Sequence, residues 1–196
     1  MNLNESRRNL KNIINKEINK INTSIGGIIL SYNHDTNRAT VQPSGVTKFT
    51  DGRTLPYPRI DNVPVVFPTS MGGTCGMTFP LNSGDGCLIV FSQDNMQDFL
   101  SKSDTDDPRR FQITDAICIP GLYTGRTAGV VNNSGDLCLF YGGSTVSLGG
   151  GGFVGKLADG TSFSFSGGDL VVNGISLVHH VHGGIVKGGG NTAEPK

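Results

Sequence analysis

The back half of the chain consists of short, similar strand-and-turn segments. Most of the 29 glycines lie after Pro120, where they form corners between runs that alternate apolar and small polar residues. The clearest runs are residues 135–142, 144–149, 161–167 and 168–174. Each run has one apolar face that it cannot bury alone, which is typical of a solenoid or β-helix. We therefore expect oligomerisation to supply the missing core. The alternative is an open meander that belongs to the first domain.

The front half has a more ordinary composition and predicts several short strands. Residues 28–32 and 38–42 flank a turn rich in Asn, Asp and Thr, which indicates a β-hairpin. Further strands are expected at residues 63–67, 76–79, 87–92 and 116–120, and prolines between them keep the strands short. Residues 97–110 are polar and acidic and predict a loop with room for one helical turn. Five or six short strands in about 100 residues fit a small closed barrel such as an OB-fold.

The N-terminus predicts one amphipathic helix over residues 4–21, and Gly26 and Gly27 are expected to end it. Its apolar residues share one narrow stripe at i, i+3 and i+4 spacing: Leu10, Ile13, Ile14, Ile18 and Ile21. The rest of its surface is polar, so the stripe must dock against other copies of the chain or against a partner protein. Asparagine is frequent here and lowers intrinsic helicity, so we expect docking to order the helix.

The composition excludes several classes of protein. The net charge is zero and the pI is near 6.9, so bulk electrostatics attract neither nucleic acid nor an anionic membrane. The first 20 residues are polar, so no signal peptide is expected. No apolar run approaches the about 18 residues of a membrane span. The four cysteines form no CxxC pair and lie in apolar runs, which favours buried free thiols over disulfides or metal ligands.

Three of the four histidines lie close together near the end of the chain, at His179, His180 and His182. An extended segment would place His180 and His182 on one side, where two neutral imidazoles could hold a transition metal. Two ligands are too few for a stable site. Three copies around a three-fold axis would bring six imidazoles to one point, which suits an octahedral ion such as iron better than tetrahedral zinc. The alternative is that His-x-His is ordinary surface polarity or a hydrogen-bonded turn.

Two blocks of the sequence resemble one known family. Residues 61–68, 77–91 and 110–121 are similar to the OB-fold domain of central, membrane-piercing baseplate spikes of contractile-tail phages, the Gp138-like proteins. Residues 174–185 and 190–195 resemble the apex of the same spikes. The Gly-rich stretch between the two blocks agrees with that family in character only.

The resemblance implies a mostly β homotrimer whose parts follow one another along the chain. These are an N-terminal docking helix (residues 1–23), an OB-fold barrel (24–124), an intertwined triple-stranded β-helix (125–174) and an apex (175–196). In that family the apical His-x-His of each subunit binds one buried iron per trimer through six nitrogens, a motif that falls on His180 and His182 here. His179 occupies a position that is usually not a ligand.

The function implied is structural. The spike would sit at the baseplate tip of the virion tail, after assembly in the host cytoplasm, and contact the baseplate hub protein and the tail tube complex. It would cap these parts and puncture the host outer membrane when the sheath contracts, with no nucleic acid as partner and no enzymatic turnover. The alternatives are an OB-fold glycan-binding module and a metal-dependent enzyme. A cupin-type enzyme would need a carboxylate and a distant histidine after the His-x-His pair, and the sequence printed ends too soon for them.

Overall fold

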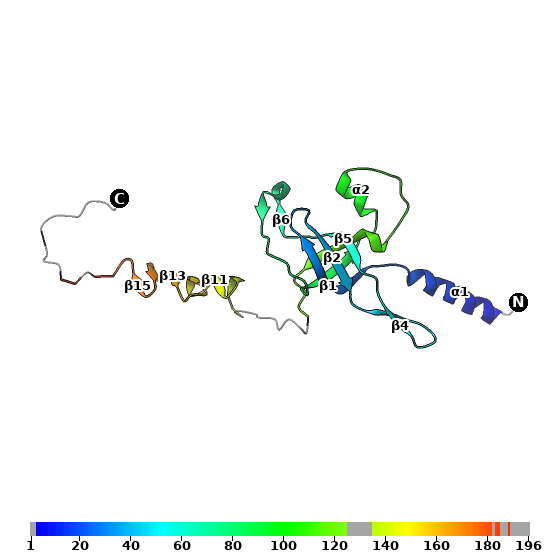
Figure 1. Ribbon diagram of the computed structural model, residues 1–196, viewed down its shortest axis with the longest axis horizontal. Coiled ribbons are helices and arrows are strands. Elements are labelled where there is room, and N and C mark those ends of the chain that lie inside the picture. Colours follow the sequence, from blue (N-terminus) through cyan, green and yellow to red (C-terminus); the bar gives the residue numbers. More distant parts are fainter. Residues whose placement is uncertain (1–2, 125–134, 182, 185–187, 189–196) are drawn as a thin grey trace. The chain divides into compact units, whose positions relative to one another are not determined.

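The computed structural model describes residues 3–124, 135–181, 183–184 and 188, and the chain divides into two units, Met1–Gly129 and Val130–Lys196 (Figure 1). Apart from an N-terminal helix, both units are mostly β, which confirms the predicted fold class at that level. Among the described residues, no helix combines the length and apolarity needed to cross a bilayer. The four predicted domain boundaries stay a prediction.

Helix α1 spans Leu3–Ile18 and confirms the predicted N-terminal helix. It ends earlier than expected, because the amides of Lys20 and Ile21 donate to carbonyls three residues back, which tightens the last turn. None of its residues is buried, and the Leu and Ile side chains of its stripe are exposed. Within the described part of the chain the stripe therefore lacks the packing that would stabilise a short helix.

The first unit contains a five-stranded antiparallel sheet. Its strands are β1 (Ser24–Asn33), β2 (Arg38–Pro43), β5 (Ile60–Pro64), β8 (Gly86–Phe91) and β9 (Ala116–Pro120), in the order β5-β2-β1-β8-β9. The two outer strands approach each other, because Val65 forms a parallel bridge with Cys118 and the Val66 amide donates to the Cys118 carbonyl at 2.9 Å. The sheet is therefore curled into a half-barrel.

The hydrophobic core of this unit lies on one face of the curled sheet. Burial alternates along β2 and β8, as expected for strands with one face inward. The core residues are Ile29, Ala39, Val41, Ile60, Val63, Val65, Phe67, Cys87, Ile89, Phe91, Ala116 and Cys118. The expectation that Gly26 and Gly27 end the helix is wrong, since both lie in β1. A Cβ on Gly27 would lie 2.6 Å from the Ile89 side chain and 2.8 Å from the Gln42 carbonyl oxygen, so this position accommodates only glycine.

Two small hairpins project from the sheet, and the sequence did not predict them. One pairs β3 (Val46–Lys48) with β4 (Thr54–Pro56), and the other pairs β6 (Thr69–Ser70) with β7 (Cys75–Gly76) around the 3-10 turn η1 (Met71–Gly73). All residues of these four strands are exposed, so neither hairpin buries one side. Their sequences therefore lack the alternation of apolar and polar residues that predicts a strand. The strand predicted over residues 76–79 is reduced to β7. Cys75 is exposed, which corrects the expectation of a buried thiol there, whereas Cys87 and Cys118 are buried.

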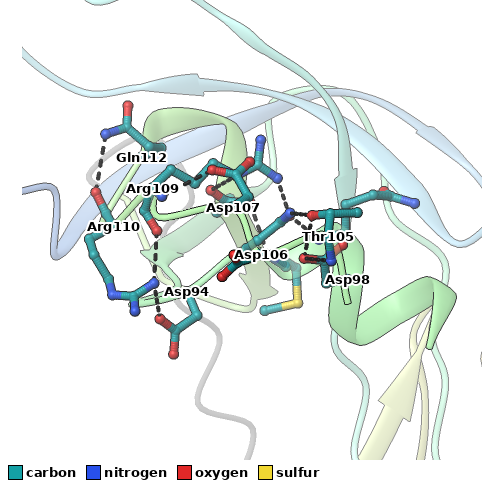
Figure 2. A network of polar contacts seen from close by, with 12 residues as sticks. Asp94, Asp98, Thr105, Asp106, Asp107, Arg109, Arg110 and Gln112 are labelled. Atoms are coloured by element: carbon teal, nitrogen blue, oxygen red, sulfur yellow. Dashed lines mark hydrogen bonds and ion pairs between the residues drawn. The ribbon is translucent and has the colours of Figure 1, made fainter. Parts of the chain in front are cut away.

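The segment between β8 and β9 forms a loop with one short helix, α2 (Met96–Ser101), as predicted in outline. Asn95 caps this helix by accepting from the Gln97 amide. Figure 2 shows a polar network around this helix and the loop after it. In this network Asp98 accepts from the Thr105 hydroxyl at 2.8 Å, and Arg110 forms an ion pair with Asp94. These local contacts order a loop that has few apolar residues.

One residue ties this loop to the core. Asp115, in the 3-10 turn η2 (Ile113–Asp115), is only 2% exposed and accepts from the Met96 amide at 3.0 Å. Arg109 Nε lies 3.2 Å from the other Asp115 oxygen, although the two atoms are not aligned for a hydrogen bond. The pair is therefore an electrostatic contact between a buried carboxylate and a half-buried guanidinium.

The second unit is a six-stranded antiparallel meander with the strands in chain order (Figure 1). They are β10 (Leu137–Tyr141), β11 (Ser144–Gly149), β12 (Gly152–Lys156), β13 (Ser162–Ser166), β14 (Asp169–Val172) and β15 (Ile175–Ser176). Tight glycine turns join most of them; Gly142 and Gly143, for example, have φ values of 55° and 87°. The predicted strand-and-turn segments are confirmed, while intertwining with other chains into a β-helix stays a prediction.

Candidate functional site

The meander has one face that is apolar across every strand. Residues directly opposite each other in antiparallel strands point to the same side, so the strand register assigns each residue to a face. One row across the sheet is Leu137, Leu148, Phe153, Phe165 and Leu170. The next row on the same side is Leu139, Val146, Gly155, Phe163, Val172 and Ile175. We call these two rows the apolar face.

The apolar face is not covered by the chain's own described residues. Among residues 135–181, only Gly155 is buried. Phe165 is 51% exposed, and the aromatic rings of Phe153 and Phe163 contact each other at a centroid distance of 5.7 Å rather than lying under another layer. A sheet that leaves this much apolar surface in water lacks the buried area that holds a small unit together.

The opposite side of the meander is more polar. It carries Thr145, Ser147, Ser162, Ser164 and Ser176, together with Lys156 and a few apolar residues such as Val154. Small hydroxyl side chains on this side are compatible with exposure to water. The two faces therefore differ in the way expected of a sheet that buries one side.

The segment with the three histidines follows directly on β15. This strand ends at Ser176 and residues 177–179 form a turn, so the strand does not continue directly to His180. The turn is bonded back to β14: the Leu177 amide donates to the Leu170 carbonyl at 2.8 Å, and the Val178 amide donates to Asp169 Oδ1 at 3.2 Å. His182 lies outside the described residues, so the pairing of His180 with His182 stays a prediction.

The His180 ring contacts the chain in a way that suits a metal ligand. Its Nδ1 lies 3.2 Å from the Leu177 carbonyl oxygen. A carbonyl can only accept, so this contact favours the tautomer with the proton on Nδ1 and the lone pair on Nε2. Metal-binding histidines commonly donate their second ring N–H to such an acceptor.

One chain does not complete a metal site within its described residues. These contain no group of three or more His, Cys, Asp or Glu side chains placed to share an ion. His34, the remaining histidine, is exposed in the β1–β2 turn, where its Nε2 lies 2.8 Å from Asp35 Oδ1. His180 could therefore supply one nitrogen donor to a transition metal, and the described residues of a single chain do not supply the rest of a donor set.

The Asp169 carboxylate is bonded to the histidine turn. A hydrogen bond from the Ser176 side chain, helped by the Val178 amide and the nearby His179 ring, holds the pKa of Asp169 below its usual value. Ser176 Oγ also accepts from the His179 amide at 2.6 Å. Spacing in the sequence gave no indication of this contact, because Asp169 and Val178 are nine residues apart and meet only through the β14–β15 hairpin.

The first unit has a groove that the sequence also did not predict. It has a volume of about 530 Å³ and lies between β5 and the α2–η2 loop, lined by Arg38, Arg59, Asp61, Met96, Leu100 and Arg109, among others. Its arginines already contact acceptors of their own chain: Arg38 donates to the Asn62 carbonyl at 3.0 Å and Arg59 lies 3.4 Å from Asp61. The groove therefore presents a mixed, internally paired set of charges.

Comparison with known proteins identifies the first unit. Residues 25–121 match the family described as phage protein Gp138 N-terminal domain. The chain is a Gp138-like phage protein. The matched Gp138 region begins in β1 and ends just after β9, so it contains the whole curled sheet and its loops. No curated protein matched the chain.

The family match confirms the resemblance to phage baseplate proteins and leaves two parts of the chain outside it. Helix α1 precedes the Gp138 domain, and the meander with its histidine turn follows it. A structural role in the phage tail therefore follows from the Gp138 domain. The roles of the apolar face and of His180 must be argued from their own geometry.

Proposed function

We propose that this chain forms the central spike at the baseplate tip of a contractile phage tail, where a homotrimer punctures the host outer membrane on sheath contraction and caps the hub and tube. The uncovered apolar face of the meander is the observation that carries this proposal. A sheet with one apolar side and no cover of its own requires other copies to bury that side. The Gp138 domain supplies the phage context.

For the first unit we propose an OB-fold. The strand order closes on itself as β1-β2-β5-β9-β8, when the parallel bridge between Val65 and Cys118 is counted with the antiparallel pairs. That order, with one parallel contact between the third and fifth strands, supports a five-stranded Greek-key barrel. The hairpins and the α2 loop are insertions between these strands.

For the second unit we propose an intertwined trimeric β-helix. Three chains could turn their apolar faces toward a common axis and leave the Ser and Thr side chains outside. Strands that pair with the other two chains cannot unravel one at a time, which suits a part that is pushed against a membrane. The function is mechanical and needs no enzymatic turnover.

At the apex we propose one iron per trimer, bound by His180 and His182 of each chain. The ion would cross-link three chain ends that would otherwise fray. Because the ion binds only the folded trimer, it would also add to the stability of that state. The Nδ1 contact of His180 with Leu177 supports the choice of its Nε2 as the ligand atom.

Helix α1 is proposed as the docking element toward the baseplate hub protein and the tail tube complex. Its exposed Leu and Ile stripe requires a partner surface, and it lies at the other end of the chain from the histidines. In this arrangement the spike resides at the tip of the virion tail.

Truncation tests whether the meander holds the trimer together. A chain ending at Thr124 keeps the curled sheet and its core, so it should remain folded. We expect light scattering to show that this fragment has lost the trimer formed by the full chain. If the fragment remains a trimer at the same concentrations as the full chain, the β-helix is not the element that holds the trimer together.

The groove beside β5 favours one second candidate, a glycan-binding module of the OB-fold type. In that case the Thr124 fragment would bind host-surface saccharide as well as the full chain does, and Arg38→Ala would abolish the binding. The spike proposal expects no dependence of tail function on Arg38.

A further inference from the structure

The only charged side chain between Thr161 and His179 belongs to Asp169, and it faces the histidine turn. Asp169 begins β14, and the hairpin made by Asn173 and Gly174 brings residues 176–178 back against it. Regular pairing ends at Val171 and Ser176. Beyond that pair, the Asp169 carboxylate takes the place of a backbone carbonyl as acceptor for the Val178 amide, at 3.2 Å. The side chain thus extends the hairpin past the end of β15.

A second contact fixes the other side of the turn. Ser176, which pairs with Val171 of β14, accepts from the His179 amide through its Oγ at 2.6 Å. Val178 is therefore held by Asp169, and His179 is held by Ser176 of the same hairpin. Three consecutive amides, those of residues 177–179, are bonded to β14 or to the end of β15.

The His180 ring depends on this turn for its orientation. Its Nδ1 lies 3.2 Å from the carbonyl oxygen of Leu177, which is the first residue of the turn. If the turn changes shape, that carbonyl moves and the ring loses the contact that favours the lone pair on Nε2. A metal site needs its ligands held close to their final geometry, so loss of such a support weakens binding.

The geometry points to Asp169 as a positioning residue of the apex, which sets the turn so that His180 faces the metal while His179 is tied back to Ser176. This inference rests on the proposed metal centre. Asp169 itself touches no metal in this account.

The test measures how fast the full-length trimer releases iron. The protein is loaded with iron(II) without oxygen, and a ferrous chelator is added in excess while the coloured complex is followed. Asp169→Ala removes the acceptor, whereas Asp169→Asn keeps an oxygen that can accept from Val178. Asp159→Ala is the matched control, since Asp159 also accepts from a backbone amide, that of Thr161 at 2.8 Å, in a turn of the same meander.

We expect Asp169→Ala to release iron about tenfold faster than the wild type or more, the usual size of effect for a group that supports a ligand. Asp169→Asn should restore nearly the wild-type rate, and Asp159→Ala should leave it unchanged. Ser176→Ala removes the bond that holds His179, and it should accelerate release even if Asp169→Ala fails to form a trimer.

Two results would overturn this role. One is release from Asp169→Ala and Ser176→Ala at the rate of the Asp159→Ala control. The other is an Asp169→Asn protein that loses iron as fast as Asp169→Ala. Faster release would then come from loss of the negative charge and not from a change in the position of the turn. A wild-type trimer that binds no iron would overturn the metal centre and this role together, so the two failures can be told apart.

Discussion

Replacing Phe165 with Ala tests whether the apolar face is the trimer core. Phe165 lies in the middle of this face, opposite Phe153 on one side and Leu170 on the other, and 51% of it is exposed in the single chain. A phenylalanine side chain can bury about 200 Å², so the trimer would cover about 100 Å² more of it in each chain.

That area sets the expected loss. At about 25 cal/mol per Å², 100 Å² corresponds to about 2.5 kcal/mol per chain and about 7.5 kcal/mol per trimer, as an upper value. A loss of about 7.5 kcal/mol would lower the association constant for three chains by about five powers of ten. Phe165→Ala should therefore dissociate at concentrations where the wild type remains a trimer.

Val154→Ala is the matched control. Val154 is also apolar and is 40% exposed, but it pairs with Ser147 and Ser164 on the other side of the sheet. Sedimentation velocity over a dilution series should show dissociation of Phe165→Ala and an intact Val154→Ala trimer. Equal behaviour of the two variants, or dissociation of Val154→Ala alone, would refute the assignment of the faces.

Two further predictions concern other parts of the chain. Gly155→Ala should lower the thermal stability of the trimer, because a Cβ there would lie 2.2 Å from the Phe163 ring, and crowding of this kind costs about 1–3 kcal/mol. Gly151→Ala, where nothing lies within 4 Å, is its control in the same melting experiment. Removal of residues 1–21, which keeps Asn22 and its 2.8 Å bond to the Phe111 carbonyl, should leave a folded trimer that fails to enter baseplates in an assembly assay. Normal incorporation would contradict the docking role of α1.

The sequence predicted those elements whose side chains alternate or repeat. The i, i+3, i+4 spacing of Leu10, Ile13 and Ile14 located α1, and the alternation within residues 161–167 located β13. In both cases the pattern is local and is read directly from neighbouring residues. The other strands of the curled sheet were found for the same reason, although the strand predicted over residues 63–67 overlaps β5 only at Val63 and Pro64.

The sequence could not predict features that depend on distant contacts. The β3–β4 hairpin is exposed on both sides and carries no alternation. Gly27 looked like a helix end, yet it is in a strand because the Ile89 side chain occupies the space beside it. The turn at residues 177–179 was not predicted, since its shape depends on a bond from the Val178 amide to a side chain nine residues away.

The most direct test of the central claim is the molar mass and the iron content of the same purified fraction. Light scattering gives the number of chains, and elemental analysis gives the metal per chain. A trimeric spike with the proposed apex predicts three chains and one iron atom, with the iron lost in a His180→Ala, His182→Ala double variant. A monomer, or one metal ion for every chain, would contradict the account.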